Sequence, residues 1–420
     1  MERYNEYKDS GVQWLGEIPG HWKTVRVKTL LSERVDKSDT GLEEPLSMSQ
    51  KYGIIPTKGM DVVPNMASTY IGSKRVFKQD IVFNKLKAHL GVFAISKYDG
   101  LVSPDYAVYT PNERTYLPFM EYVFHTPLYI GEFTRRATGV AIGLTRLYTN
   151  GLFAIPFLYP PIEEQHSIVS YLDEKCGKID KMLEGKQKQI ELLAEMKQCI
   201  IADAVTHGLN PDVRMKETNS ICLGEVPMHW RVMRYGTLFK LKPVKLHHGE
   251  ELLSVFLNFG VIRAAESDKR THAASEDLSK YQLVEPTDFV MNNQQAWRGS
   301  VGVSKLTGII SPAYHIFKMP NCFDAEYANY LLRSKAIVGQ FEISSRGVGS
   351  IQRTLNFNWL NNRTIPVPPL SEQRSIVSYI TDKTSKIDTL TSKLQQEIES
   401  IKEYKQRLIS DVVTGQIKVC

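Results

Sequence analysis

PPIEEQHSIVSYLDEKCGKID, at residues 160–180, returns as PPLSEQRSIVSYITDKTSKID at residues 368–388, with 13 of 21 positions identical. The two copies begin 208 residues apart, and the same offset separates LGEIPGHW, which begins at Leu15, from LGEVPMHW, which begins at Leu223. Self-similarity at a fixed spacing indicates repeated structural units. The chain of 420 residues therefore consists of two similar halves.

The similarity between the halves is uneven. Between Lys23 and Ala154 the match to the second half is reduced to Asp, Gly, Ser-Pro and alternating apolar residues. Each half is thus a divergent globular segment followed by a shared segment. We predict globular domains at residues 1–159 and 209–365, and helical spacers at residues 160–208 and 366–420. The shared part is suited to assembly, and the divergent part is free to differ.

The shared segments are predicted to form long helices over Ile162–Thr206 and Leu370–Thr414, each ~66 Å long. Neither contains proline, both are rich in Glu, Lys and Gln, and Gly208 and Gly415 suit the helix ends. Apolar or small residues recur at steps of three and four along both: Leu172, Cys176, Ile179, Leu183, Ile190, Leu193, Met196, Ile200 and Ala204, then Ile380, Ile387, Leu394, Ile398, Ile401, Tyr404, Leu408 and Val412.

An amphipathic helix of this length needs a partner for its apolar stripe. Antiparallel pairing of the two helices within the chain is the simplest arrangement. Packing of each helix against its own domain, or in a bundle with another protein, remains open. The globular segments are predicted to be α/β (α+β), because residues 94–111 alternate like strand, turn and strand, and residues 118–133 look like a helix interrupted at Pro127.

Composition sets wide limits on function. The formal net charge is +6, which permits a polyanionic partner without demanding one. No apolar run approaches the roughly 18 residues that a membrane span needs, and the start, MERYNEYKDSG, lacks the apolar region of a signal peptide. The 5 cysteines are scattered without a CxxC pair. We expect a cytoplasmic protein.

Motifs for catalysis are not found in the sequence. There is no GxxxxGK[ST] phosphate loop, and no [ND]PP[YF] sequence of the kind that amino-methyltransferases use. Asp105 has no acidic-x-Lys sequence to complete a nuclease core, and the second half carries Ala313 at its place. His247-His248 lacks a third ligand at metal spacing and is interpreted as a loop. The sequence therefore predicts a binding protein without a catalytic residue, cofactor or metal of its own.

Two polar segments recur at matching places in the halves. Between two predicted strands, the first half carries Lys85, Lys87 and His89 before Gly91, and the second carries Asn293, Gln294, Gln295 and Arg298 before Gly299. A second loop contributes Arg135, Arg136 and Arg146 in the first half, and Arg346, Gln352 and Arg353 in the second. Asn and Gln can pair with adenine, and Arg and Lys with guanine or phosphate. Any one of these side chains is as readily a solvated loop residue, but their recurrence favours DNA binding.

With these segments in view, the chain resembles the specificity subunits of type I restriction-modification enzymes. The resemblance rests on YKDSGVQWLGEIPGHW, on the two proline-to-helix blocks, and on Asp80-Ile-Val with Ser103-Pro104-Asp105-Tyr106. It implies two target-recognition domains, each reading one half of a bipartite site on double-stranded DNA. The paired helices would fix the unread spacer.

The resemblance also implies partners. Two modification subunits would supply S-adenosylmethionine binding and adenine methylation, and two restriction subunits would supply ATP-driven translocation and cleavage, which need Mg²⁺. The base-contacting loops named above are inferred from their chemistry, because target-recognition domains vary with the sequence that they read. Two other hypotheses stay open: a non-catalytic adaptor that binds proteins through two domains on a coiled-coil spacer, and a methyltransferase or nuclease active by itself.

Overall fold

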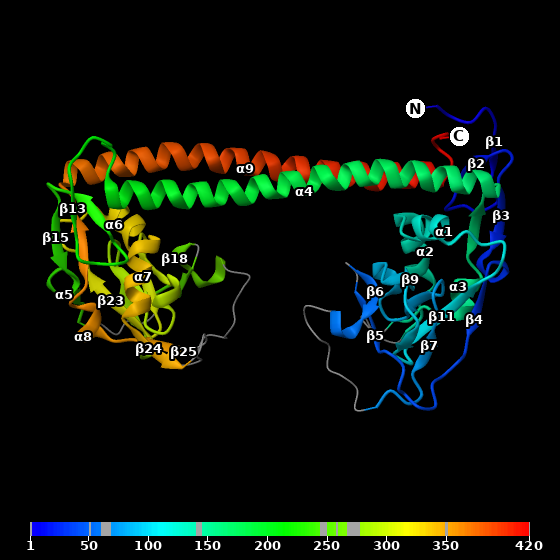
Figure 1. Cartoon of the computed structure of the whole chain (residues 1–420), viewed down its shortest axis with the longest axis horizontal. Helices are drawn as coiled ribbons and strands as arrows, with labels where there is room; N and C mark the ends of the chain where they lie inside the picture. Colours follow the sequence, from blue (N-terminus) through cyan, green and yellow to red (C-terminus); the bar gives the residue numbers. More distant parts are fainter. Residues whose placement is uncertain are drawn as a thin grey trace. The chain divides into compact units, whose positions relative to one another are not determined.

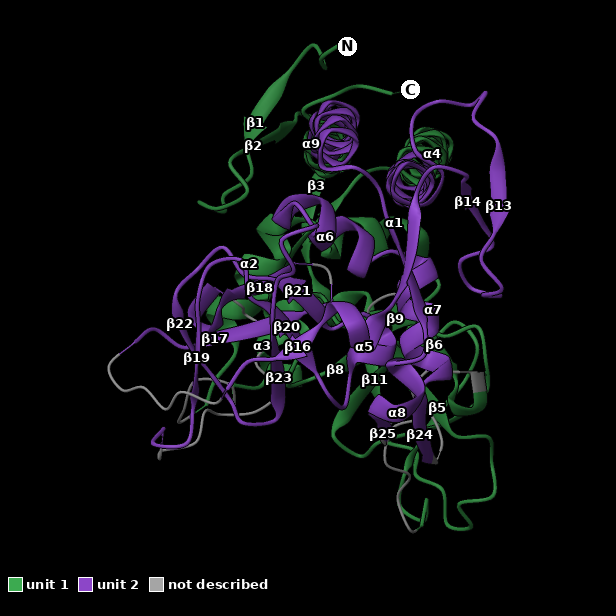
Figure 2. Ribbon diagram, turned by 90° about the vertical axis from the view of Figure 1, so that its left-hand side faces the viewer, with its two compact units in different colours: residues 1–186, 396–420 green, residues 187–395 purple. Residues whose placement is uncertain are grey.

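The computed structural model of the chain describes residues 2–49, 52–59, 69–139, 145–243, 250–257, 259–266, 278–348 and 352–419. It divides into two compact units (Figure 2). Unit 1 comprises residues 1–186 and 396–420, and unit 2 comprises residues 187–395. Each unit thus contains one globular segment together with part of each long helix.

Unit 1 is built on a four-stranded antiparallel sheet with the order β4 (Leu31–Arg34), β11 (Tyr106–Pro111), β8 (Ile81–Asn84) and β9 (Phe93–Ile95). The remaining strands form two-stranded pairs: β1 (Tyr7–Asp9) with β2 (Glu17–Pro19), β3 (Lys23–Arg26) with β12 (Pro156–Tyr159), β5 (Leu46–Ser49) with β6 (Gly53–Pro56), and β7 (Lys74–Val76) with β10 (Gly100–Val102). Three short helices complete the unit: α1 (Leu117–Phe124), α2 (Pro127–Arg136) and α3 (Thr149–Phe153).

Unit 2 repeats this topology. Its four-stranded sheet has the order β16 (Lys240–Leu241), β23 (Tyr314–Lys318), β20 (Phe289–Asn292) and β21 (Val301–Val303). Its pairs are β13 (Met215–Glu217) with β14 (Glu225–Pro227), β15 (Arg231–Arg234) with β26 (Thr364–Val367), β17 (Leu253–Phe256) with β18 (Gly260–Arg263), β19 (Gln282–Val284) with β22 (Gly308–Ile310), and β24 (Ser345–Val348) with β25 (Gln352–Leu355). Its helices are α5 (Tyr235–Leu238), α6 (Ala325–Leu332), α7 (Lys335–Ile343) and α8 (Phe357–Leu360). The α/β repeat predicted from the sequence is confirmed.

The predicted interruption of a helix at Pro127 is also confirmed. Helix α1 ends at Phe124, and α2 begins at Pro127 with the Thr126 side chain accepting a hydrogen bond from the amide of Tyr129. Proline fits the first turn of a helix, where its missing N–H has no partner to lose. Ser334 caps α7 of unit 2 in the same way, by accepting from the amide of Ile337.

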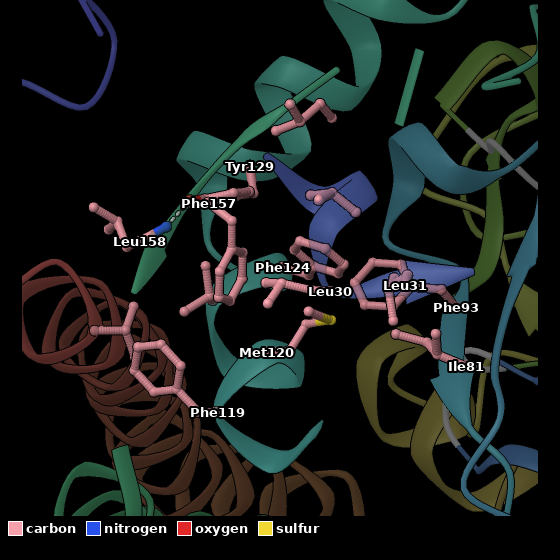
Figure 3. Close-up of a cluster of buried hydrophobic side chains, with 14 of the residues drawn as sticks. Leu30, Leu31, Ile81, Phe93, Phe119, Met120, Phe124, Tyr129, Phe157 and Leu158 are labelled. Atoms are coloured by element: carbon pink, nitrogen blue, oxygen red, sulfur yellow. Dashed lines mark hydrogen bonds between the residues drawn. The ribbon is translucent and has the colours of Figure 1, made fainter. Parts of the chain in front are cut away.

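Aromatic and aliphatic side chains on one face of the central sheet of unit 1 form its main core with the helices (Figure 3). A smaller cluster, which includes Val82, Ala94 and Val108, lies on the other face of the sheet. Phe124 meets Phe157 edge to face at 5.6 Å between ring centres. The hydroxyl of Tyr129 accepts a hydrogen bond from the Leu158 amide at 3.1 Å and donates one to the Pro156 carbonyl at 3.2 Å. Helix α2, which ends in Arg135 and Arg136, is therefore fixed to β12 and to the core.

The long helices α4 (Ile162–His207) and α9 (Leu370–Val413) are drawn in green and orange-red in Figure 1. Gly208 and Gly415 follow them with φ of +79° and +75°, a left-handed conformation that suits glycine at a helix end. In unit 1, Asp180 pairs with Lys405 and Lys186 with Glu397, whereas in unit 2 Lys197 pairs with Asp388. Since residue numbers rise along α4 as they fall along α9, the pairing is antiparallel, as predicted.

The stripe that joins the helices follows steps of four and three. It contains Lys197 and Lys405, whose ammonium groups reach carboxylates across the pair at 2.6 Å. The prediction that Met196 and Tyr404 belong to the stripe is wrong, because their side chains are 45% and 50% exposed. When contacts between two helices repeat every 3.5 residues, only one of two neighbouring residues can face the partner helix. Here Lys197 and Lys405 face it.

Candidate nucleic-acid interface

The loop from Lys85 to Gly91 in unit 1 joins β8 to β9 through a single turn of 3-10 helix at residues 88–90. The turn ends at Gly91 with φ of +72°, and a Cβ built there would lie 3.3 Å from Ile130 of α2. Lys87 is exposed, and Lys85 and His89 are half-buried. The loop therefore lies against α2, the helix that carries Arg135 and Arg136.

The two segments predicted in the first half meet in the structure. The carbonyl of Lys85 accepts a hydrogen bond from the Leu147 amide at 3.0 Å. Arg146, directly before it, exchanges backbone hydrogen bonds of 2.9 and 3.0 Å with Thr138, and its guanidinium lies 3.5 Å from Asp105. Residues 140–144 between them lie outside the described part of the chain.

Two buried nitrogen atoms also lie in this region, one on Lys74 and one on His89. The Lys74 ammonium is buried and donates to the Tyr106 carbonyl at 2.8 Å. Burial lowers the pKa of Lys74, and the neighbouring charge of Lys85 lowers it further. The Nδ1 atom of His89 is buried without a hydrogen-bond partner in the described structure.

Arg135 and Arg136 share one carboxylate, that of Glu132. Arg135 donates from Nε at 2.7 Å and from Nη2 at 2.8 Å, and Arg136 donates from Nε at 2.5 Å. Burial of Glu132 would raise the pKa of its carboxyl group, but the hydrogen bonds from both arginines outweigh it and the pKa lies below its usual value. Glu132 was not predicted from the sequence, although its spacing of three and four residues from the arginines is a recognised signal for helical ion pairs.

In unit 2 the equivalent loop joins β20 to β21 through residues 296–298 and ends at Gly299 with φ of +97°. The amide of Gln294 donates to Oδ1 of Asn292 at 3.0 Å, and the indole of Trp297 donates to the Gln294 carbonyl at 3.0 Å. Gln294 is exposed, whereas Asn293 and Gln295 are half-buried. The loop therefore holds its amide side chains on an ordered turn.

The second predicted segment of unit 2 forms the hairpin of β24 and β25. The Arg353 guanidinium lies 4.7 Å from the ring centre of Trp297 and 3.3 Å from a carboxylate oxygen of Glu342, while Arg298 lies 5.7 Å from the same ring. The two segments of the second half thus also meet. Gln352 is described only by its backbone in β25.

Arg346 contacts an aromatic residue that was not predicted from the sequence. Its guanidinium lies 4.5 Å from the ring centre of Trp359 on α8, and both side chains are exposed. A cation over an aromatic face is attracted without using its N–H donors. No sequence spacing predicts this contact, because it depends on how the hairpin folds onto α8.

The described residues contain no group of three or more His, Cys, Asp or Glu placed to hold a metal ion. His247-His248 lies outside them. Within the same residues no helix is long and apolar enough to cross a membrane.

Residues 297–400 match the family model of the type I restriction modification DNA specificity domain. The chain is 26% identical over 278 residues to the type I restriction enzyme MjaVIII specificity subunit of Methanocaldococcus jannaschii, a match that covers 62% of this chain and 61% of the relative, less than two thirds of its length. It is 22% identical over 436 residues to the putative type I restriction enzyme MjaX specificity subunit of the same organism, covering 96% of each.

A similar fold occurs in a solved structure described as the structural basis underlying complex assembly and conformational transition of the type I R-M system. The likeness has a TM-score of 0.66 at 16% identity, and it covers 95% of this chain and 99% of the other. At this identity the likeness concerns the fold.

Proposed function

Because this chain belongs to the family of type I restriction-modification specificity subunits, we propose that it supplies sequence-specific binding of double-stranded DNA to a larger enzyme. Each unit reads one half of a bipartite site through its paired loops. The chain itself is not catalytic and works in the cytoplasm.

One observation carries this proposal: in both units, two segments distant in sequence come together and present cationic or amide side chains. Lys85 and Leu147 are joined by a backbone hydrogen bond in unit 1, and Trp297 and Arg353 are in contact in unit 2. Cationic side chains suit phosphate and guanine, and amides suit adenine. Such a pair of surfaces fits a duplex better than it fits a small molecule.

The partners follow from the family. Two modification subunits bring S-adenosylmethionine and methylate adenine, and two restriction subunits bring ATP-driven translocation and Mg²⁺-dependent cleavage. Helices α4 and α9 serve as the ruler for the unread spacer and as part of the dock for the modification subunits. Two half-sites read from one face of a duplex lie about one helical turn apart, ~34 Å.

The test is an exchange of recognition segments. Residues 11–159 are replaced by those of a relative, the hybrid is expressed with its modification subunits, and methylated adenines are mapped across the host genome. We expect one half of the methylated site to change and the other half to stay. A change in both halves would contradict the modular assignment.

Salt dependence separates DNA binding from the adaptor hypothesis. Binding of the assembled complex to a duplex should weaken with a slope of about 0.9 in log affinity per log salt for each phosphate contacted. Binding that is absent, or insensitive to salt, would favour a protein-binding adaptor. Methylation or cleavage by this chain alone would favour the self-sufficient enzyme.

A further inference from the structure

Glu132 is a buried carboxylate in an unfavourable place. It lies one residue before the last turn of α2, and its side chain is 3% exposed. A carboxylate loses solvation when it is buried. The hydrogen bonds from the two arginines that follow it compensate for this loss, so the three side chains form one ion-paired cluster.

The geometry leaves part of each guanidinium for another partner. Arg135 uses Nε and Nη2 on Glu132, and Arg136 uses Nε. Within the described structure neither arginine has a second carboxylate partner, and the side chain of Arg135 is 65% exposed. Nη1 of Arg135 is therefore available to an anion. The Arg136 side chain is 25% exposed, and within the described residues its Nη atoms donate to no carboxylate.

The matching position of unit 2 shows that the fold does not need a carboxylate here. Gln340 lies 208 residues after Glu132 on the equivalent helix α7, is buried, and donates from Nε2 to the Thr364 carbonyl at 3.0 Å. The residues matching the two arginines are Ile343 and Ser344. The carboxylate is thus present in the unit that has arginines and replaced by a neutral amide in the unit that lacks them.

We propose that Glu132 is a positioning residue that holds Arg135 and Arg136 against the phosphates of the half-site bound by unit 1. This inference rests on the proposed DNA-binding function. Glu132 itself touches no DNA. It fixes the Nε edges of both guanidinium groups. Their remaining N–H groups can then bind DNA phosphates at a smaller cost in side-chain entropy.

The substitution Glu132→Gln tests the proposal, because its two possible effects have opposite signs. Removing a negative charge near DNA should strengthen binding if only net charge matters. Releasing two positioned arginines should weaken it. The duplex used contains the recognition site of the parent protein. We expect the variant complex, assembled with modification subunits, to bind it about tenfold more weakly than the parent complex does near physiological salt.

The salt slope distinguishes positioning from damage to the fold. Loss of two phosphate contacts should reduce the slope of log affinity against log salt by about 1.8, whereas a smaller fraction of folded protein leaves the slope unchanged. In the background Arg135→Gln with Arg136→Gln, the further change Glu132→Gln should have no additional effect on affinity or slope.

Glu43→Gln is the matched control. Glu43 is in the same unit, accepts from Nε of Arg75 at 2.7 Å, and lies outside the candidate interface, and Arg75 keeps Asp36 as a second partner. This variant loses the same charge and should bind like the parent protein. Wild-type affinity and slope in Glu132→Gln, or equal losses in both variants, would overturn the positioning role. A parent complex that binds duplex without salt dependence would overturn the proposed function itself.

Discussion

At the start of each long helix the same histidine–carboxylate hydrogen bond occurs, His21 with Glu164 in unit 1 and His229 with Glu372 in unit 2, both at 2.8 Å. Directly before strand β8 and before strand β20, a buried aspartate binds a cation 46 residues earlier: Asp80 binds Arg34 at 2.8 Å, and Asp288 binds Lys242 at 2.5 Å. All of these residues are related by the offset of 208.

The loops of the candidate nucleic-acid interface, by contrast, differ between the units. Unit 1 presents Lys85, Lys87 and a carboxylate-bound pair of arginines, whereas unit 2 presents amides and arginines that stack on Trp297 and Trp359. A shared interior with unlike loops allows each surface to change while the fold stays the same. We therefore predict that unit 1 binds DNA more through charge, and unit 2 more through the pattern of hydrogen bonds to bases.

The largest effects on stability are expected at Asp80 and Asp288, the buried aspartates that the two units share. Asp80→Ala and Asp288→Ala should each destabilise their own unit by about 3 kcal/mol, because each leaves a cation without its main buried partner. Denaturant unfolding of the full chain, followed by signals specific to each unit, measures the two values. If one variant were neutral and the other severe, the two aspartates would not be equivalent.

The next prediction distinguishes the loops of the two units by how each contributes to DNA binding. Replacing both Lys85 and Lys87 by Gln should reduce the salt slope of DNA binding by about 1.8, because each loses a phosphate contact. Replacing Gln294 and Gln295 by Ala should leave the slope unchanged and reduce discrimination at a base by about 1–3 kcal/mol. Salt titrations with matched and mismatched duplexes measure both quantities. Equal loss of slope in the two variants would remove the proposed difference between the units.

A smaller effect is expected at Trp359. The change Trp359→Leu should weaken DNA binding by about 0.5–1 kcal/mol, because Arg346 loses the aromatic face that orients it. Trp359→Phe keeps an aromatic ring and should bind more like the parent. Binding measurements on both variants test this, and identical behaviour of Leu and Phe would show that the ring does not orient Arg346.

The smallest effect is expected at the helix seam. Lys197→Ala and Lys405→Ala should each change the free energy of unfolding by about 0.5 kcal/mol, because both ion pairs remain partly exposed. Thermal unfolding of the two variants compares the seam in unit 2 with that in unit 1. A loss of several kcal/mol in either would mean that the lysine does more than pair with a carboxylate.

Local sequence patterns predicted the repeat and the long helices well. The predicted ends at Thr206 and Thr414 lie within one residue of the observed ends at His207 and Val413. The error at Met196 and Tyr404 arose because apolar character alone does not distinguish a seam position from its neighbour when the seam residue is a lysine. The aliphatic stem of lysine packs in the seam while its ammonium reaches the partner helix.

Apart from the antiparallel pairing of the two long helices, contacts between distant segments were not predicted from the sequence. The strand β10 follows β9 directly but pairs with β7, and Arg346 meets Trp359 only because a hairpin folds onto α8. The DNA-contacting residues named from the sequence stay a prediction. The structure brings their segments together in each unit, with the side chain of Gln352 outside what it describes.

The core of unit 1 has a consequence for how the protein is made. Leu408, Val412 and Val413 of α9 are buried in the same cluster as Trp22 and Phe157, and the amide of Lys418 donates to the carbonyl of Glu2 at 2.9 Å. During translation, the ribosome must add more than two hundred residues after Phe157 before these partners emerge. The region synthesised first therefore waits longest for its interior to be filled, and a nascent chain stalled before α9 would expose that unfilled surface to chaperones and proteases.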